Sequence, residues 1–154
     1  MRTEAPLAHG RPMDTTTTTS TVPAEVVAGI YAAFGRDDMP GLLARLHPQV
    51  DWSAEVTAPG AELVPMLRQG VGRAAVERYF DGGAQLAFHT FEVGRVLVDG
   101  DAVVVVEIHL VASHRTTQKT ATIDELHHWI VRDGLVVRYR PYVNTAALIE
   151  RCKP

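Results

Sequence analysis

The chain has 154 residues, of which 46% are hydrophobic and 21% are charged, and its formal net charge is -3. This composition is typical of a globular protein with one hydrophobic core. The net charge and the scattered Lys and Arg residues argue against a nucleic-acid-binding protein, which usually carries a basic face. The one cysteine, Cys152, excludes an intramolecular disulfide and a cysteine metal cage.

Membrane insertion and secretion are not expected either. The longest apolar run, residues 102–106, is far too short to cross a bilayer. The first ten residues lack the continuous apolar segment of a signal peptide. We therefore expect a soluble cytoplasmic protein with no membrane partner and no nucleic-acid partner.

The N-terminal segment is predicted to be disordered over residues 1–22. It contains five consecutive threonines, Thr15 to Thr19, which offer little apolar surface to bury and form no helical stripe. A single folded domain is predicted over residues 23–151.

Helices are predicted in the first half of this domain. Apolar residues at spacings of three and four predict a helix over residues 23–35, and shorter helices are expected over residues 40–47 and 73–80. A short extended segment is predicted at residues 50–52. The segment from Thr57 to Gly72 is rich in proline and glycine, which predicts a long loop, and loops of this length often act as lids.

The second half is predicted to be β-structure. Strands are expected over residues 88–98 and 102–114, followed by a hairpin over residues 122–144 with a two-residue turn at Asp133-Gly134. A last helical turn is expected over residues 145–151. Helices followed by an antiparallel meander predict an α+β fold, with the helices packed on one face of a curved antiparallel sheet.

The first strand of the hairpin carries an unusual set of side chains on one face. Because side chains alternate across a strand, Glu125, His127, Trp129 and Val131 share that face. An acid, an imidazole and an indole in a row indicate either a cavity lining or a wet, structural sheet face. Tryptophans such as Trp129 and Trp52 are more often core residues than ligand platforms.

The preceding strand extends this set under one assumption about register. If the loop between the two strands is centred near Gln118, His109 faces His127 and Glu107 faces Trp129. Two carboxylates and two imidazoles on one patch would suit proton transfer. A one-residue slip would separate the two sets onto opposite faces, and an exposed sheet surface would also accept Glu107 and His109.

The last strand has one polar and one apolar face. The polar set comprises Arg138, Arg140, Tyr142 and Asn144. The other face carries Leu135, Val137, Tyr139, Pro141 and Val143. This second face is too apolar to leave in water, which predicts a homodimer packed sheet against sheet.

Several motifs together resemble the SnoaL-like families over residues 23–149. They are Tyr31-Ala-Ala-Phe, Leu42-Leu, Asp51-Trp, Gly72-Arg-Ala-Ala-Val, Asp99-Gly-Asp and Arg132-Asp-Gly-Leu-Val-Val-Arg-Tyr. These families share a cone-shaped fold with nuclear transport factor 2, ketosteroid isomerases and polyketide cyclases. The resemblance implies a conical pocket that opens at the segment from Thr57 to Gly72.

The resemblance also points to individual positions. Relatives often carry Glu-x-His-x-Trp in the penultimate strand, which corresponds here to Glu125, His127 and Trp129. Relatives often end the last strand with Tyr-x-Asp-Thr, where this chain has Tyr142-Val-Asn144-Thr. The amide of Asn144 cannot take up a proton at neutral pH, so it is expected to orient a ligand by hydrogen bonds.

The resulting hypothesis is a cofactor-free enzyme that isomerises, cyclises or hydrates a small hydrophobic substrate by acid–base chemistry. The expected catalytic residues are Glu125, His127 and His109. The expected substrate-binding residues are Trp52, Tyr31, Glu107, Trp129, Arg140, Tyr142 and Asn144. No metal is expected, because no metal-ligand spacing such as His-Glu-x-x-His occurs. The alternative is a non-catalytic ligand-binding or dimerisation domain of the same fold.

Overall fold

The computed structural model of the protein describes residues 22–53 and 55–154, so the disorder predicted for residues 1–22 falls outside it except at Val22. The elements, in chain order, are α1 (Val22–Gly35), α2 (Met39–Leu43), β1 (Leu46–Trp52), η1 (Ala61–Leu63), η2 (Pro65–Leu67), β2 (Gly70–Val71), α3 (Arg73–Gly83), β3 (Leu86–Asp99), β4 (Val103–His114), β5 (Thr120–Arg132), β6 (Leu135–Tyr142) and α4 (Thr145–Cys152). None of the helices in these ranges is long and apolar enough to cross a membrane.

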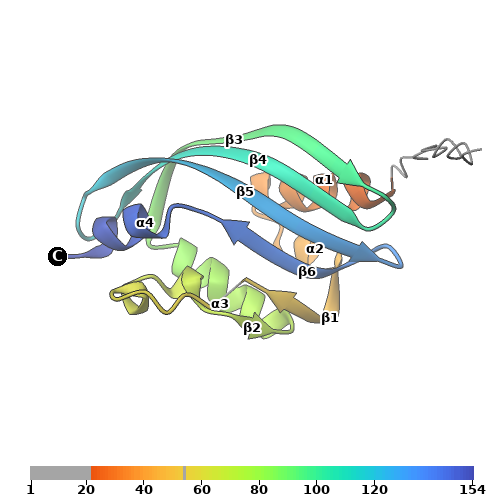
Figure 1. The fold of residues 1–154 in the computed structure, drawn as a ribbon, viewed down its shortest axis with the longest axis horizontal. Helices are drawn as coiled ribbons and strands as arrows, with labels where there is room; N and C mark the ends of the chain where they lie inside the picture. The colour runs from red at the N-terminus through yellow and green to blue at the C-terminus, as the bar shows by residue number, and fades with distance from the viewer. Residues whose placement is uncertain (1–21, 54) are drawn as a thin grey trace, which may run out of the picture.

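The six strands form one curved sheet in the order β2-β1-β6-β5-β4-β3 (Figure 1). The predicted antiparallel meander from β3 to β6 is confirmed. The α+β fold is confirmed, and β1, which was predicted only as a short extended segment, joins the sheet by pairing in parallel with β6, so the sheet is mixed. Parallel pairing needs a long crossover connection, which the chain supplies through α3 and the three strands that follow it.

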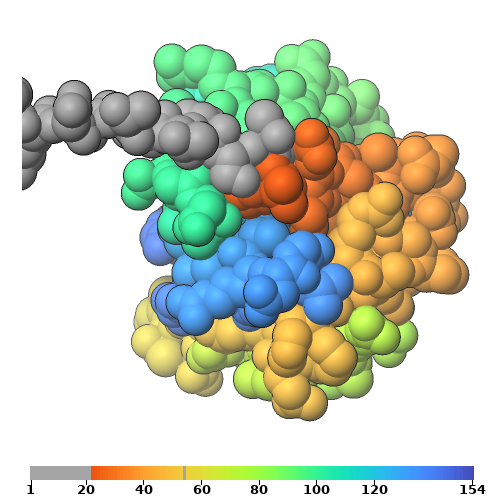
Figure 2. All heavy atoms as spheres, turned by 90° about the vertical axis from the view of Figure 1, so that its right-hand side faces the viewer, coloured from red at the N-terminus to blue at the C-terminus, as the bar shows by residue number. Residues whose placement is uncertain are grey.

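The β5–β6 hairpin has the predicted two-residue turn. Asp133 and Gly134 both adopt positive φ, at 50° and 74°, and Arg132 pairs directly with Leu135. These angles match the right-handed twist of the flanking strands. At this end of the molecule the hairpin lies beside α1 and the segment from α2 into β1 (Figure 2).

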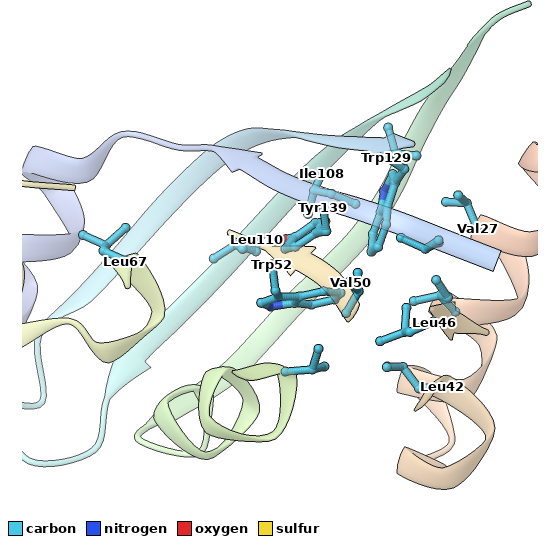
Figure 3. Close-up of a cluster of buried hydrophobic side chains, with 14 of the residues drawn as sticks. Val27, Leu42, Leu46, Val50, Trp52, Leu67, Ile108, Leu110, Trp129 and Tyr139 are labelled. Carbon is cyan, nitrogen blue, oxygen red and sulfur yellow. The ribbon is translucent and has the colours of Figure 1, made fainter. Parts of the chain in front are cut away.

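The hydrophobic core lies between the helices and the inner face of the sheet. Its centre is a group of three aromatic residues, in which the ring centroid of Tyr139 lies 4.3 Å from the ring centroids of both Trp52 and Trp129 (Figure 3). Both tryptophans are almost fully buried. Rings at this spacing add to the stability that their burial provides.

The β4–β5 register differs from the one predicted. Val106, and not His109, pairs with His127, and Ile108 pairs with Glu125. The strands are therefore offset by three residues relative to the prediction. An odd offset moves one strand's entire side-chain set to the opposite face.

Glu107 and His109 consequently lie on the outer face of the sheet, and the predicted cluster with Glu125 and His127 is wrong. His109 pairs in register with Asp124, and its Nδ1 lies 2.6 Å from the Asp124 carboxylate.

The faces of β6 also differ from their expected roles. The apolar face of β6 was expected to form an exposed dimer surface. Tyr139, which belongs to that face, is buried in the core, so the face points inward over this part of the strand. Arg138 and Arg140 lie on the outer face, where both form ion pairs with Asp51 at 3.3 Å and 3.6 Å. The premise of the dimer prediction is therefore wrong, although a homodimer through the outer face stays a prediction.

Candidate functional site

A cavity of about 500 Å³ lies between the helices and the inner face of the sheet. Its wall is largely aromatic and aliphatic. Apolar lining residues include Tyr31, Phe34, Leu42, Trp52, Met66, Leu67, Tyr79, Phe80, Phe88, Phe91, Leu110, Ile123, Trp129, Tyr139 and Leu148. This size and character suit a small, mostly apolar organic molecule.

The cavity reaches the surface between the α1–α2 turn, the end of α3 and the start of β3. The lining residues exposed there are Asp37, Asp81, Ala84 and Phe88. The expected mouth at residues 57–72 is therefore wrong. That segment instead contributes Met66 and Leu67 to the cavity wall.

Four polar side chains form a continuous hydrogen-bonded chain along the cavity wall. The Tyr31 hydroxyl lies 2.7 Å from Nδ1 of His127, and Nε2 of His127 lies 3.0 Å from Oε1 of Glu125. The indole Nε1 of Trp129 donates to the Tyr31 hydroxyl at 3.2 Å. The predicted shared face of Glu125, His127 and Trp129 is thus present, and α1 adds Tyr31 to it.

Hydrogen-bonding chemistry assigns a direction to each bond in this chain. The indole of Trp129 can only donate, and an ionised Glu125 carboxylate can only accept. The Tyr31 oxygen therefore accepts from Trp129, and when His127 is neutral and Glu125 is ionised it donates its proton to Nδ1 of His127. Nε2 of a neutral His127 then donates to Glu125. With this tautomer, each group in the chain has a partner of the correct kind.

The chain is well shielded from solvent. The side chains of His127 and Glu125 are only 8% and 11% exposed. Burial raises the pKa of the Tyr31 phenol well above its ordinary value, with a further increase from the negative charge of Glu125 and a partial offset from the Trp129 hydrogen bond. Tyr31 is therefore a proton donor at neutral pH.

Two further phenols, Tyr79 and Tyr139, also line the cavity, with their hydroxyls 3.3 Å apart. Burial raises the pKa of both, and the charge of Glu125 contributes to the increase. They provide uncharged hydroxyl groups to the cavity at neutral pH.

Other residues expected at the site lie elsewhere. Glu107 pairs with Arg95 on the outer face at 2.6 Å, and His109 lies on the same face. Arg140 also lies there, and Tyr142 is largely exposed. Asn144 is the N-cap of α4, where its side chain accepts a hydrogen bond from the backbone of Ala147 at 3.1 Å.

Lining residues that the sequence analysis did not assign to the site include Tyr79, Tyr139 and Arg151. Arg151 is buried at the C-terminal end of α4 and also lines the cavity. Its spacing of three from Leu148 places it on the buried side of that helix, a signal that could have identified it.

A metal site is not evident in the part of the chain that the structure describes. No group of three or more His, Cys, Asp or Glu side chains there could hold a metal ion.

Solved structures with a similar fold include an NTF2-like protein of unknown function from Burkholderia pseudomallei, with a TM-score of 0.74 and 20% identity over 88% of this chain and 100% of that chain. TerC, co-crystallized with polyporic acid, gives a TM-score of 0.71 and 24% identity over 86% of this chain and 99% of that chain. A proposed SnoaL-like polyketide cyclase from Mesorhizobium loti gives a TM-score of 0.60 and 17% identity over 77% of this chain and 97% of that chain. Identities this low show a shared fold alone.

A search of curated proteins found no match. The sequence profile of the SnoaL-like domain matches residues 27–139, which is more than half of the chain. The chain therefore belongs to the SnoaL-like family and has an NTF2-like, small-molecule-binding fold.

Proposed function

We propose that the protein is a cofactor-free enzyme that moves a proton on a small, largely apolar carbonyl compound, with Glu125 as the general base. The observation that carries this proposal is the hydrogen-bonded chain from Trp129 through Tyr31 and His127 to Glu125. A binding site could provide apolar contact without such a chain. A base needs an oriented carboxylate, and the hydrogen bond from His127 orients that of Glu125.

The carboxylate of Glu125 has one oxygen free to react. Oε1 accepts the hydrogen bond from His127, whereas no described residue donates a hydrogen bond to Oε2. Glu125 lines the cavity, so Oε2 is available to a bound ligand. His127 orients the carboxylate, and Tyr31 selects the His127 tautomer that can do so. Tyr31 and His127 are therefore positioning residues.

The proposed reaction breaks a C–H bond next to a carbonyl group. The proton passes to Oε2 of Glu125, and the electron pair moves to the carbonyl oxygen to form an enolate. Return of the proton from Glu125 to another carbon completes an isomerisation. In a cyclisation, the enolate carbon attacks a second carbonyl group, and the resulting alkoxide oxygen takes the proton from Glu125.

The enolate oxygen needs a hydrogen-bond donor in the cavity. Trp52 lines the cavity, and its buried Nε1 has no hydrogen-bond partner among the described residues. A ligand oxygen bound there would satisfy this N–H and would stabilise the developing negative charge. This assigns Trp52 a substrate-binding role.

Proton exchange on a model ketone tests the proposal without knowledge of the natural substrate. We expect the wild-type protein to accelerate exchange of the acidic C–H protons of 2-tetralone into D₂O, followed by proton NMR. Glu125→Gln should abolish the acceleration while binding of 2-tetralone remains. The matched control is Glu92→Gln, an exposed glutamate on the outer face, which should exchange at the wild-type rate.

The alternative is a ligand-binding protein, which the largely apolar wall also fits. Tight binding of 2-tetralone with no exchange above the buffer rate in the wild-type protein would contradict the enzyme proposal and favour this alternative.

A further inference from the structure

We infer that the cavity has a second polar end, at Arg151, which binds an anionic oxygen of the ligand. This inference rests on the proposed function, because it names a chemical class for the molecule that the same cavity binds. The ligand would be a compound with an apolar ring or chain and a carboxylate group.

Arg151 lies in the last turn of α4 and lines the cavity. Its NH1 donates to the carbonyl oxygen of Ala112 in β4 at 3.4 Å, and its own carbonyl accepts a hydrogen bond from Thr117 Oγ1 at 2.8 Å. These contacts hold the C-terminal end of α4 against β4 and the β4–β5 loop, so the guanidinium has a defined position.

The guanidinium is a buried cation with incomplete pairing. Arg151 is only 3% exposed, and no carboxylate of the described residues lies within 4.0 Å of it. Its Nε is buried and has no hydrogen-bond partner among those residues. Buried charges in proteins are normally paired, because an unpaired one is strongly destabilising. A ligand anion would complete the pairing.

Neighbouring groups in the protein do not take this role. Burial lowers the pKa of the Arg151 guanidinium, and the Cys152 thiol and the more distant Glu125 carboxylate only partly offset that effect. Burial also raises the pKa of Cys152, so its sulfur is a neutral thiol at neutral pH. An uncharged thiol is a weak hydrogen-bond acceptor and cannot neutralise a guanidinium.

The spacing between the two polar ends restricts the size of the ligand. Ala112 pairs with Ala121, which lies four residues from Glu125 along β5, or about 13 Å at the rise of a strand. Leu110 and Ile123, which pair with each other between these positions, line the cavity with apolar surface. A bicyclic ring with one anionic substituent would fit between the two ends.

A matched pair of ligands tests the inference directly. 2-Naphthoate and 2-naphthalenemethanol have the same ring system and differ in charge. We expect isothermal titration calorimetry to show that the wild-type protein binds 2-naphthoate at least about tenfold more tightly than 2-naphthalenemethanol. The reason is that charge-assisted hydrogen bonds to a guanidinium are strong.

Arg151→Met should reduce the affinity ratio of the two ligands to about one, since it retains the bulk of the side chain and removes the charge. Arg132→Met is the matched control. It makes the same change in net charge at an exposed position in the β5–β6 hairpin, and it should retain the wild-type ratio.

NMR of the wild-type protein provides a second measurement that does not depend on the folding of a variant. The Arg151 Nε–H resonance should shift on addition of 2-naphthoate and remain in place with 2-naphthalenemethanol. Equal affinity of the wild-type protein for both ligands, or a preference for naphthoate that survives in Arg151→Met, would overturn the anion subsite and leave the proposed function intact. Failure of both ligands to bind would overturn both.

Discussion

The hydroxyl of Tyr31 in α1 lies 2.7 Å from Nδ1 of His127 in β5, although the two residues are 96 positions apart in the chain. The two rings are also nearly parallel, with centroids 5.9 Å apart. This contact attaches the first helix to the strand that carries Glu125. It therefore contributes both to the stability of the fold and to the geometry of the candidate site.

Replacement of Tyr31 by Phe should destabilise the protein. The change leaves the buried Nε1 of Trp129 and Nδ1 of His127 without their shared partner, and an unsatisfied buried polar group costs about 1–3 kcal/mol. Urea denaturation should therefore give a lower free energy of unfolding for Tyr31→Phe. The control, Tyr142→Phe, removes the hydroxyl of an exposed tyrosine and should change the free energy by less than about 0.5 kcal/mol. Equal stability of the two variants would contradict the assigned hydrogen bonds.

We expect the protein to form a homodimer through the outer face of the sheet. Leu97, Leu126 and Tyr142 are exposed there, and Leu126 and Tyr142 pair directly across β5 and β6. Leu126→Arg would place an unpaired charge in such an interface and should convert the dimer to a monomer. Sedimentation velocity checks both proteins, and a monomeric wild-type protein at micromolar concentration would contradict the dimer.

The outer face also contains a histidine whose charge depends on its neighbour. The hydrogen bond to Asp124 raises the pKa of His109 above its ordinary value of 6.5, with smaller electrostatic contributions from Asp124 and Glu92 and a partial offset from desolvation. NMR titration should therefore give a midpoint for His109 above 6.5, and Asp124→Asn should lower it. An unchanged midpoint in Asp124→Asn would contradict this pairing.

The same shift determines how this pair affects folding as the pH changes. Because the pKa of His109 is higher in the folded state, its stabilising contribution is complete below the unfolded value of 6.5. The contribution is lost as the pH rises through the folded pKa. Asp124→Asn should therefore lower the free energy of unfolding at pH 5.5 more than at pH 8.5, as measured by urea denaturation at the two pH values.

Local sequence patterns predicted the longer helices, the four strands of the meander and one face of the site, whereas the helix expected over residues 40–47 ends at Leu43 and β1 begins at Leu46. The alternation of β5 correctly grouped Glu125, His127 and Trp129, and Asp133-Gly134 correctly located the hairpin turn. These features depend on residues close together in the chain, where the strand period and turn chemistry determine the result.

Relationships between distant segments could not be obtained in this way. The β4–β5 register depends on the conformation of the connecting loop, and an error of three residues was enough to assign Glu107 and His109 to the wrong face. Likewise, the contact of Tyr31 with His127 and the position of Arg151 depend on how α1 and α4 pack against the sheet. That packing is a property of the whole core.

The central claim of this account is that Glu125, His127 and Tyr31 form a directed hydrogen-bonded chain, in which His127 is neutral and protonated at Nε2. Nitrogen NMR of ¹⁵N-histidine-labelled protein at pH 7.5 measures this state without a ligand, and loss of the signal in His127→Asn assigns it. The account predicts that Nε2 of His127 carries the proton and that Nδ1 has the shift of an unprotonated, hydrogen-bonded nitrogen. In Tyr31→Phe, the Nδ1 resonance of His127 should move towards the chemical shift of an unprotonated nitrogen that accepts no hydrogen bond. A His127 protonated at Nδ1 in the wild-type protein would contradict the account.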